Sequence, residues 1–104
     1  MITKKKSEAK AFLEDISGGP LTFGEMIRSI RQADEISQAD LARRMKISRA
    51  MLCDIEKGRR PVSVERAKIF AEDLGYSVTQ FVAVAVEEQL RKSGFNAKIH
   101  LEAA

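Results

Sequence analysis

The most chemically distinctive part of this chain is a cluster of basic side chains between positions 43 and 60. Its members are Arg43, Arg44, Lys46, Arg49, Lys57, Arg59 and Arg60. Only Asp54 and Glu56 oppose these seven, which leaves a local charge of +5, whereas the whole chain carries +3. Cations concentrated in one segment bind polyanions, because they replace the counterions condensed around phosphate groups. The cluster therefore indicates a nucleic-acid partner.

Residues that could catalyse a reaction or bind a metal are scarce. Cys53 is the single cysteine and His100 the single histidine, so the chain lacks both an internal disulfide and the ligands of a Cys/His metal cage. It also has no glycine-rich phosphate loop, nucleophile elbow or pair of converging acids. We expect no enzyme activity, no catalytic residues, no metal and no cofactor.

Composition indicates one small folded domain. Apolar residues make up 44% of the 104 positions and charged residues 32%. The longest strictly apolar run, Phe81 to Val86, is too short for a membrane span, and no secretory signal follows the basic N-terminus. We expect a cytoplasmic protein without a membrane partner.

Two short helices joined by a tight turn are predicted between Ser37 and Gly58. Ser37 and Ser48 can each accept a hydrogen bond from the first turn of a helix, and Gly58 can end the second helix. The apolar residues have the spacing of two helices that cross at a steep angle: Leu41, Met45, Ile47, Leu52 and Ile55. This is the outline of a helix-turn-helix motif.

The same segment resembles the Xre or phage-repressor (Cro and cI) class of helix-turn-helix proteins. The family pattern is S-Q-x-x-L-A, a turn, an apolar residue with Ser, and apolar-E-x-G. It is matched here by Ser37, Gln38, Leu41, Ala42, Ile47, Ser48, Ile55, Glu56 and Gly58. The turn position is usually Gly but here is Lys46, which would incur roughly 1 kcal/mol of strain in a left-handed conformation.

This resemblance implies how the protein contacts double-stranded DNA. The helix 48–57 would enter the major groove, where Arg49 could bind O6 and N7 of guanine and Ala50 a thymine methyl. For Asp54 two roles stay open: accepting from a cytosine amino group or orienting Arg49. The predicted base contacts are Arg49, Ala50, Cys53 and Asp54. The predicted phosphate contacts are Gln38, Arg43, Ser48, Lys57, Arg59 and Arg60.

Two further basic residues and one ion pair complete the expected site. Arg44 and Lys46 are expected to be solvated surface charges. The resemblance also implies a partly buried, structural ion pair between Arg31 and Glu56.

Helices are predicted on both sides of the motif. Thr22 with Glu25 forms a capping box that begins a helix ending near Asp34. Ser63 begins a helix with the candidate core residues Val64, Ala67, Ile69, Phe70 and Leu74, and Ser77 with Gln80 begins a helix from Val78 to about Lys92. Near the N-terminus, residues 7–16 form a short amphipathic helix that must dock on its own domain, a dimer mate or a foreign protein.

The C-terminal part of the chain indicates a dimer. The helix 78–92 is apolar around more than half of its circumference, and after Gly94 apolar residues alternate as in a half-buried strand. A lone strand needs a partner, which a second copy could supply by antiparallel pairing. The predicted interface residues are Phe81, Val82, Val86, Leu90, Phe95, Ala97, Ile99 and Leu101. Such a dimer would place two recognition helices about 34 Å apart, matching a palindromic operator.

Together these observations predict an all-α, five-helix repressor-like domain with a short N-terminal helix and a C-terminal strand. The expected division is an N-terminal arm and linker (1–20), a helix-turn-helix domain (21–93) and a dimerisation strand (94–104). We expect a homodimeric, sequence-specific transcriptional regulator, most simply a repressor. The alternative is a DNA-binding antitoxin that neutralises a toxin partner through its N-terminal arm.

Overall fold

Serine and threonine caps define where the helices of this protein begin. The computed structural model describes residues 21–102, in which Thr22, Ser37, Ser48, Ser63 and Ser77 each accept a hydrogen bond from the backbone N–H three residues later. The five helices of this region are α2 (Phe23–Ala33), α3 (Gln38–Met45), α4 (Arg49–Glu56), α5 (Val64–Leu74) and α6 (Val78–Lys92). The all-α class and the five-helix domain are confirmed.

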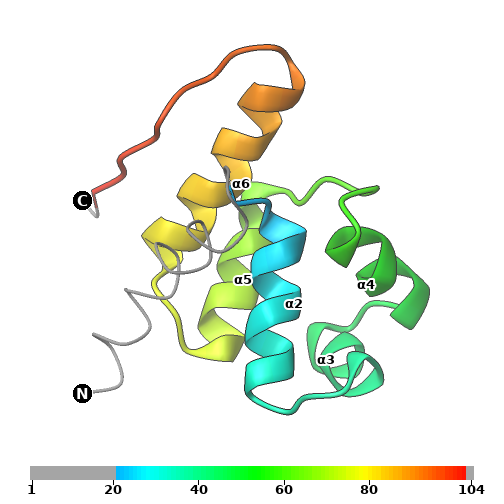
Figure 1. Cartoon of the computed structure of the whole chain (residues 1–104). Helices are drawn as coiled ribbons and strands as arrows, with labels where there is room; N and C mark the ends of the chain where they lie inside the picture. The colour runs from blue at the N-terminus through cyan, green and yellow to red at the C-terminus, as the bar shows by residue number, and fades with distance from the viewer. Residues whose placement is uncertain (1–20, 103–104) are drawn as a thin grey trace.

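In the view of Figure 1, α2 and α5 occupy the middle of the fold, with α3 and α4 on one side and α6 on the other. Three aromatic rings join these layers: Phe23 makes edge-to-face contacts with Phe70 and Phe81, at centroid distances of 5.6 and 5.8 Å. The motif helices bury Leu41, Leu52 and Ile55 against the same core. The core therefore fixes α4 at the edge of the molecule, with one side free.

Two apolar residues of α5 lie outside this core, contrary to the sequence prediction. Val64 and Ile69 are each 50% exposed. Val64 belongs to the first turn of the helix, and Ile69 lies on the side opposite the stripe formed by Ala67 and Phe70. Helical periodicity identifies apolar residues but does not show which of them a neighbouring helix covers.

The turn between α3 and α4 contains a left-handed residue that is not glycine. Lys46 has φ 59° and ψ 41°, and its N–H donates to carbonyl groups at the end of α3. Ile47 N–H then donates to the Ala42 carbonyl at 3.0 Å, which closes the turn. A left-handed lysine costs roughly 1 kcal/mol relative to glycine, so the buried contacts of the two helices must outweigh this strain.

Helix α6 is tied to the beginning of α2 and to the loop after α4. Phe23 N–H donates to the Glu88 carboxylate at 2.8 Å, and the Gln89 side chain donates to the Val62 carbonyl at 2.9 Å. Phe81, predicted at a dimer interface, instead lies in the core and is 2% exposed. Much of the apolar surface of α6 is therefore buried within the fold of a single chain.

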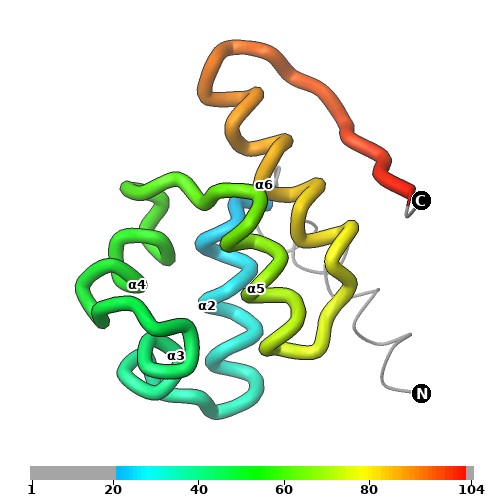
Figure 2. Tube along the Cα trace, turned by 180° about the vertical axis from the view of Figure 1, so that it is seen from behind, coloured from blue at the N-terminus to red at the C-terminus, as the bar shows by residue number. Residues whose placement is uncertain are grey.

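The C-terminal segment does not form the predicted strand. After Gly94, residues 95–102 have irregular backbone and turn back from the far end of α6 (Figures 1 and 2). Ile99 N–H donates to the buried Glu87 carboxylate at 2.7 Å. A strand needs a neighbouring strand to satisfy its backbone N–H and carbonyl groups, and residues 21–102 contain no strand that could pair with this segment.

Several sequence predictions concern residues that the structure does not describe. The amphipathic helix at 7–16 and the rest of the N-terminal arm lie outside the described residues, as do residues 103 and 104. Within the described part, none of the helices has the length and hydropathy needed to cross a membrane.

Candidate nucleic-acid interface

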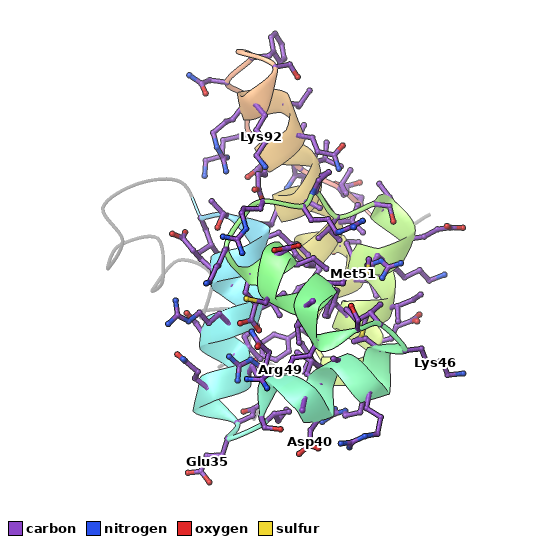
Figure 3. The ribbon with its side chains drawn as sticks, turned by 90° about the vertical axis from the view of Figure 1, so that its right-hand side faces the viewer. Glu35, Asp40, Lys46, Arg49, Met51 and Lys92 are labelled. Carbon is purple, nitrogen blue, oxygen red and sulfur yellow. The ribbon has the colours of Figure 1, made fainter. Side chains whose placement is uncertain are left out.

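Helix α4 turns one side away from the core. Leu52 and Ile55 are buried, whereas Arg49 and Ala50 are exposed. Cys53 and Asp54 are half-buried and lie within the same outward face, since their positions are one turn after Arg49 and Ala50. The structure therefore brings together the residues that the sequence predicts as base contacts. Figure 3 views this side of the molecule, with Arg49 at the start of α4 and Lys46 in the preceding turn.

A partly buried ion pair lies beneath this face. Arg31 Nε donates to Glu56 Oε2 at 2.7 Å, and Arg31 Nη2 donates to Glu56 Oε1 at 3.1 Å. The two side chains are 12% and 3% exposed. Arg31 Nη1 also donates to the Ile36 carbonyl at 2.9 Å, so the guanidinium is bound on three sides. This pairing fixes the end of α4 against α2.

Gln38 connects this ion pair to the surface. Its Nε2 donates to Glu56 Oε1 at 3.1 Å, and its Oε1 accepts from Arg49 Nε at 3.2 Å. A carboxylate only accepts and a guanidinium only donates, so only one orientation of the Gln38 amide satisfies both partners. A continuous chain of hydrogen bonds thus joins Arg31, Glu56, Gln38 and Arg49. We call these four residues the Arg31–Arg49 network.

Asp54 does not orient Arg49, which was one of its two predicted roles, but binds Arg59 instead. Its Oδ1 accepts from Arg59 at 2.9 and 3.2 Å. Its backbone carbonyl accepts from the N–H groups of Arg59 and Arg60, which closes the loop after α4. Asp54 therefore holds Arg59, while Gln38 holds Arg49.

The remaining residues predicted to contact phosphates differ in whether their side chains already have a partner within the protein. Arg43 donates to Asp40 at 2.8 Å, and hydrogen bonds from Arg43 and then Ser37 lower the pKa of the Asp40 carboxyl. The Ser48 hydroxyl accepts from Met51 N–H as a helix cap. Lys57 and Arg60 are exposed. Exposed cations without a competing carboxylate are the better phosphate contacts.

Arg44 is not the free surface charge that the sequence suggested. It pairs with Asp73 at 2.8 Å and so joins α3 to α5. This partner is 29 residues away, so no local pattern predicts it. Lys46, the other residue predicted to be solvated, is exposed.

A groove of about 530 Å³ opens beside the Arg31–Arg49 network, between α2, α3 and α4. One of its lining residues, Arg28, was absent from the sequence-based site. Arg28 lies three residues before Arg31, so both side chains project from one side of α2. That spacing is the signal that could have identified it. No three metal-binding side chains gather anywhere in residues 21–102.

Comparisons with known proteins agree with this geometry. A family model described as helix-turn-helix matches residues 27–81, more than half of the chain. The chain is 30% identical over 78 residues to an immunity repressor protein of Bacillus phage phi105, covering 75% of this chain and 54% of that protein. It thus spans about half the length of this relative. No solved structure gives a significant match.

Proposed function

Because this chain belongs to the Xre and phage-repressor class of helix-turn-helix proteins, we propose that it is a sequence-specific, double-stranded DNA-binding transcriptional regulator. The simplest action is repression, in which the protein occupies a site that polymerase needs. The observation that carries this proposal is the outward face of α4. On this face the Arg49 side chain is oriented by a hydrogen bond to Gln38, and the neighbouring side chains are small or polar.

The geometry of Arg49 supports direct contact with a guanine. Gln38 accepts from Nε of Arg49, which leaves the two terminal nitrogens of the guanidinium for the O6 and N7 acceptors in the major groove. The small side chain of Ala50 allows close approach to a thymine methyl. Around this centre, Lys57 and Arg60 bind phosphates and set the position of α4 on the duplex.

Alanine at position 49 tests this proposal. We expect Arg49→Ala to weaken binding to the operator by about 1–3 kcal/mol, which is roughly 5- to 150-fold, because a bidentate base contact is lost. Binding to unrelated DNA should change much less. The measurement is a gel-shift titration against genomic fragments from around the gene, at one fixed salt concentration.

Lys68→Ala is the matched control, because Lys68 is an exposed cation of α5 outside the interface. It should leave the ratio of specific to unspecific affinity unchanged. Wild-type binding that is indifferent to sequence, together with no effect of Arg49→Ala, would contradict the proposal.

One domain covers only half of a palindromic site, so the proposal includes a homodimer. Val82, Val86 and Leu90 of α6 are partly buried, whereas Phe95 and Leu101 are 62% and 40% exposed. The alternation of apolar residues in 95–101 supports pairing of this segment with the same segment of a second copy. Phe81 is excluded from this interface by its burial in the core.

Serine substitutions test the dimer. The double variant Phe95→Ser/Leu101→Ser is expected to shift the protein from dimer to monomer at micromolar concentration, because it removes the exposed apolar side chains of the paired segment. Ile69→Ser is the control, since Ile69 is comparably exposed but lies on α5. Light scattering after size-exclusion chromatography gives the mass. A wild-type monomer, or a dimer unaffected by the double variant, would rule out this interface.

The antitoxin alternative depends on the N-terminal helix at 7–16, which lies outside the described residues. The phage relative is described as an immunity repressor. We therefore propose the regulator without a toxin partner.

A further inference from the structure

The groove beside the Arg31–Arg49 network has an excess of positive charge. Its lining includes four cationic side chains, from Arg28, Arg31, Arg49 and Lys57, and a single carboxylate, that of Glu56. The other lining residues are neutral: Gln32, Ser37, Gln38 and Cys53. Such a surface attracts an anion.

The single carboxylate is already used. Glu56 accepts from Arg31 and Gln38, and Arg49 Nε is bound to Gln38. Among residues 21–102, by contrast, Arg28 and Lys57 have no hydrogen bond or ion pair from their side chains. Two cations of this groove, one on α2 and one at the end of α4, therefore have no side-chain hydrogen bond or ion pair within residues 21–102.

We infer that Arg28 and Lys57 together bind one phosphate of the DNA backbone in this groove. The inference rests on the proposed function and adds a contact from α2, outside the helix-turn-helix motif. DNA is the ligand that the position favours, because the groove includes Arg49, and an α4 placed in the major groove brings a flanking phosphate beside that residue. The phosphate would hold the end of α4 and thereby fix the position of this helix relative to the bases that Arg49 contacts.

Salt dependence separates a phosphate contact from a structural role. Arg28→Gln is compared with Lys68→Gln, which removes the same charge from a residue outside the groove. Operator affinity is measured by fluorescence anisotropy over a series of chloride concentrations. We expect Arg28→Gln to reduce the slope of log K against log salt by up to about 0.9 per bound protomer, since Lys57 remains at the phosphate, while Lys68→Gln leaves the slope unchanged. Binding to operator and to mutated operator should weaken by the same factor.

Ethylation interference identifies the phosphate directly. One backbone position in each half-site should inhibit wild-type binding when ethylated, and should inhibit binding of Arg28→Gln less, because only Lys57 then contacts that phosphate. Arg28→Lys should retain both the slope and the interference, since it keeps the charge. Both variants should melt like the wild type, because Arg28 has no protein partner among the described residues.

The possible failures are distinguishable. If the wild type does not discriminate operator from random DNA, the proposed function itself fails. If it does discriminate, but Arg28→Gln and Lys68→Gln give the same slope and interference pattern, only the phosphate contact is overturned. Binding of inorganic phosphate at this groove without any altered DNA interference would also overturn it, since the ligand would then be a free anion.

Discussion

Replacing Glu56 with alanine is expected to lower the free energy of unfolding by about 3–5 kcal/mol. The substitution would leave the Arg31 guanidinium, 12% exposed, without its carboxylate partner, and would also remove the acceptor of Gln38. A largely buried cation without a counter-charge is strongly disfavoured in the folded state. Urea denaturation followed by circular dichroism gives the free energy of unfolding.

The double variant Arg31→Met/Glu56→Leu isolates the charge effect. It removes both charges and keeps similar side-chain volume, so it should be considerably more stable than the sum of the single substitutions predicts. The Ile36 carbonyl would still lose its Arg31 donor, so full recovery is not expected. Simple additivity of the two single substitutions would show that the pair does not act as a unit.

The same double variant should affect DNA binding differently from stability. Even if folding recovers, Gln38 would have no carboxylate to fix its amide, and Arg49 would lose its oriented partner. Affinity for the operator should therefore stay below that of the wild type even though the melting temperature recovers in part. The hydrogen-bonded network thus couples a stabilising ion pair to the residue proposed to contact bases.

The features that could be predicted from the sequence are those set by neighbouring residues. A helix cap involves a side chain and a backbone N–H three residues away, so Ser48 and Ser63 could be identified directly. The left-handed conformation of Lys46 was anticipated from the family resemblance, because the family usually has glycine at this turn position. The contact between Arg31 and Glu56 spans 25 residues and came from the family resemblance rather than from any local pattern.

The features that could not be predicted depend on how helices are placed in space. The pairing of Arg44 with Asp73 requires α3 to meet α5, and the link from Gln38 to Glu56 requires the start of α3 to face the end of α4. Phe81 was assigned to the wrong surface because periodicity shows that a face is apolar but not what covers it. For the same reason, an alternating C-terminal segment did not guarantee a strand within one chain.

Gly24 is a further residue whose role only the structure shows. It lies in the first turn of α2, where the backbone of α4 approaches closely. A Cβ atom placed on Gly24 would overlap the Ile55 carbonyl oxygen and lie 2.8 Å from that of Glu56. These are backbone atoms, which cannot move aside as a flexible side chain could. The absence of a side chain at position 24 therefore lets α4 pack against α2.

Gly24→Ala is accordingly expected to destabilise the protein by about 3 kcal/mol, at the upper end of the usual effect of overpacking. Helix propensity predicts the opposite sign, since alanine is favoured over glycine inside a helix by up to about 1 kcal/mol. The exposed position Gln32 of the same helix provides the control, because Gln32→Ala should be more stable than Gln32→Gly. Thermal and urea unfolding give the stability of all three variants relative to the wild type. If Gly24→Ala stabilises the fold as propensity alone requires, then the close approach of α2 and α4 is not a constraint on the native state.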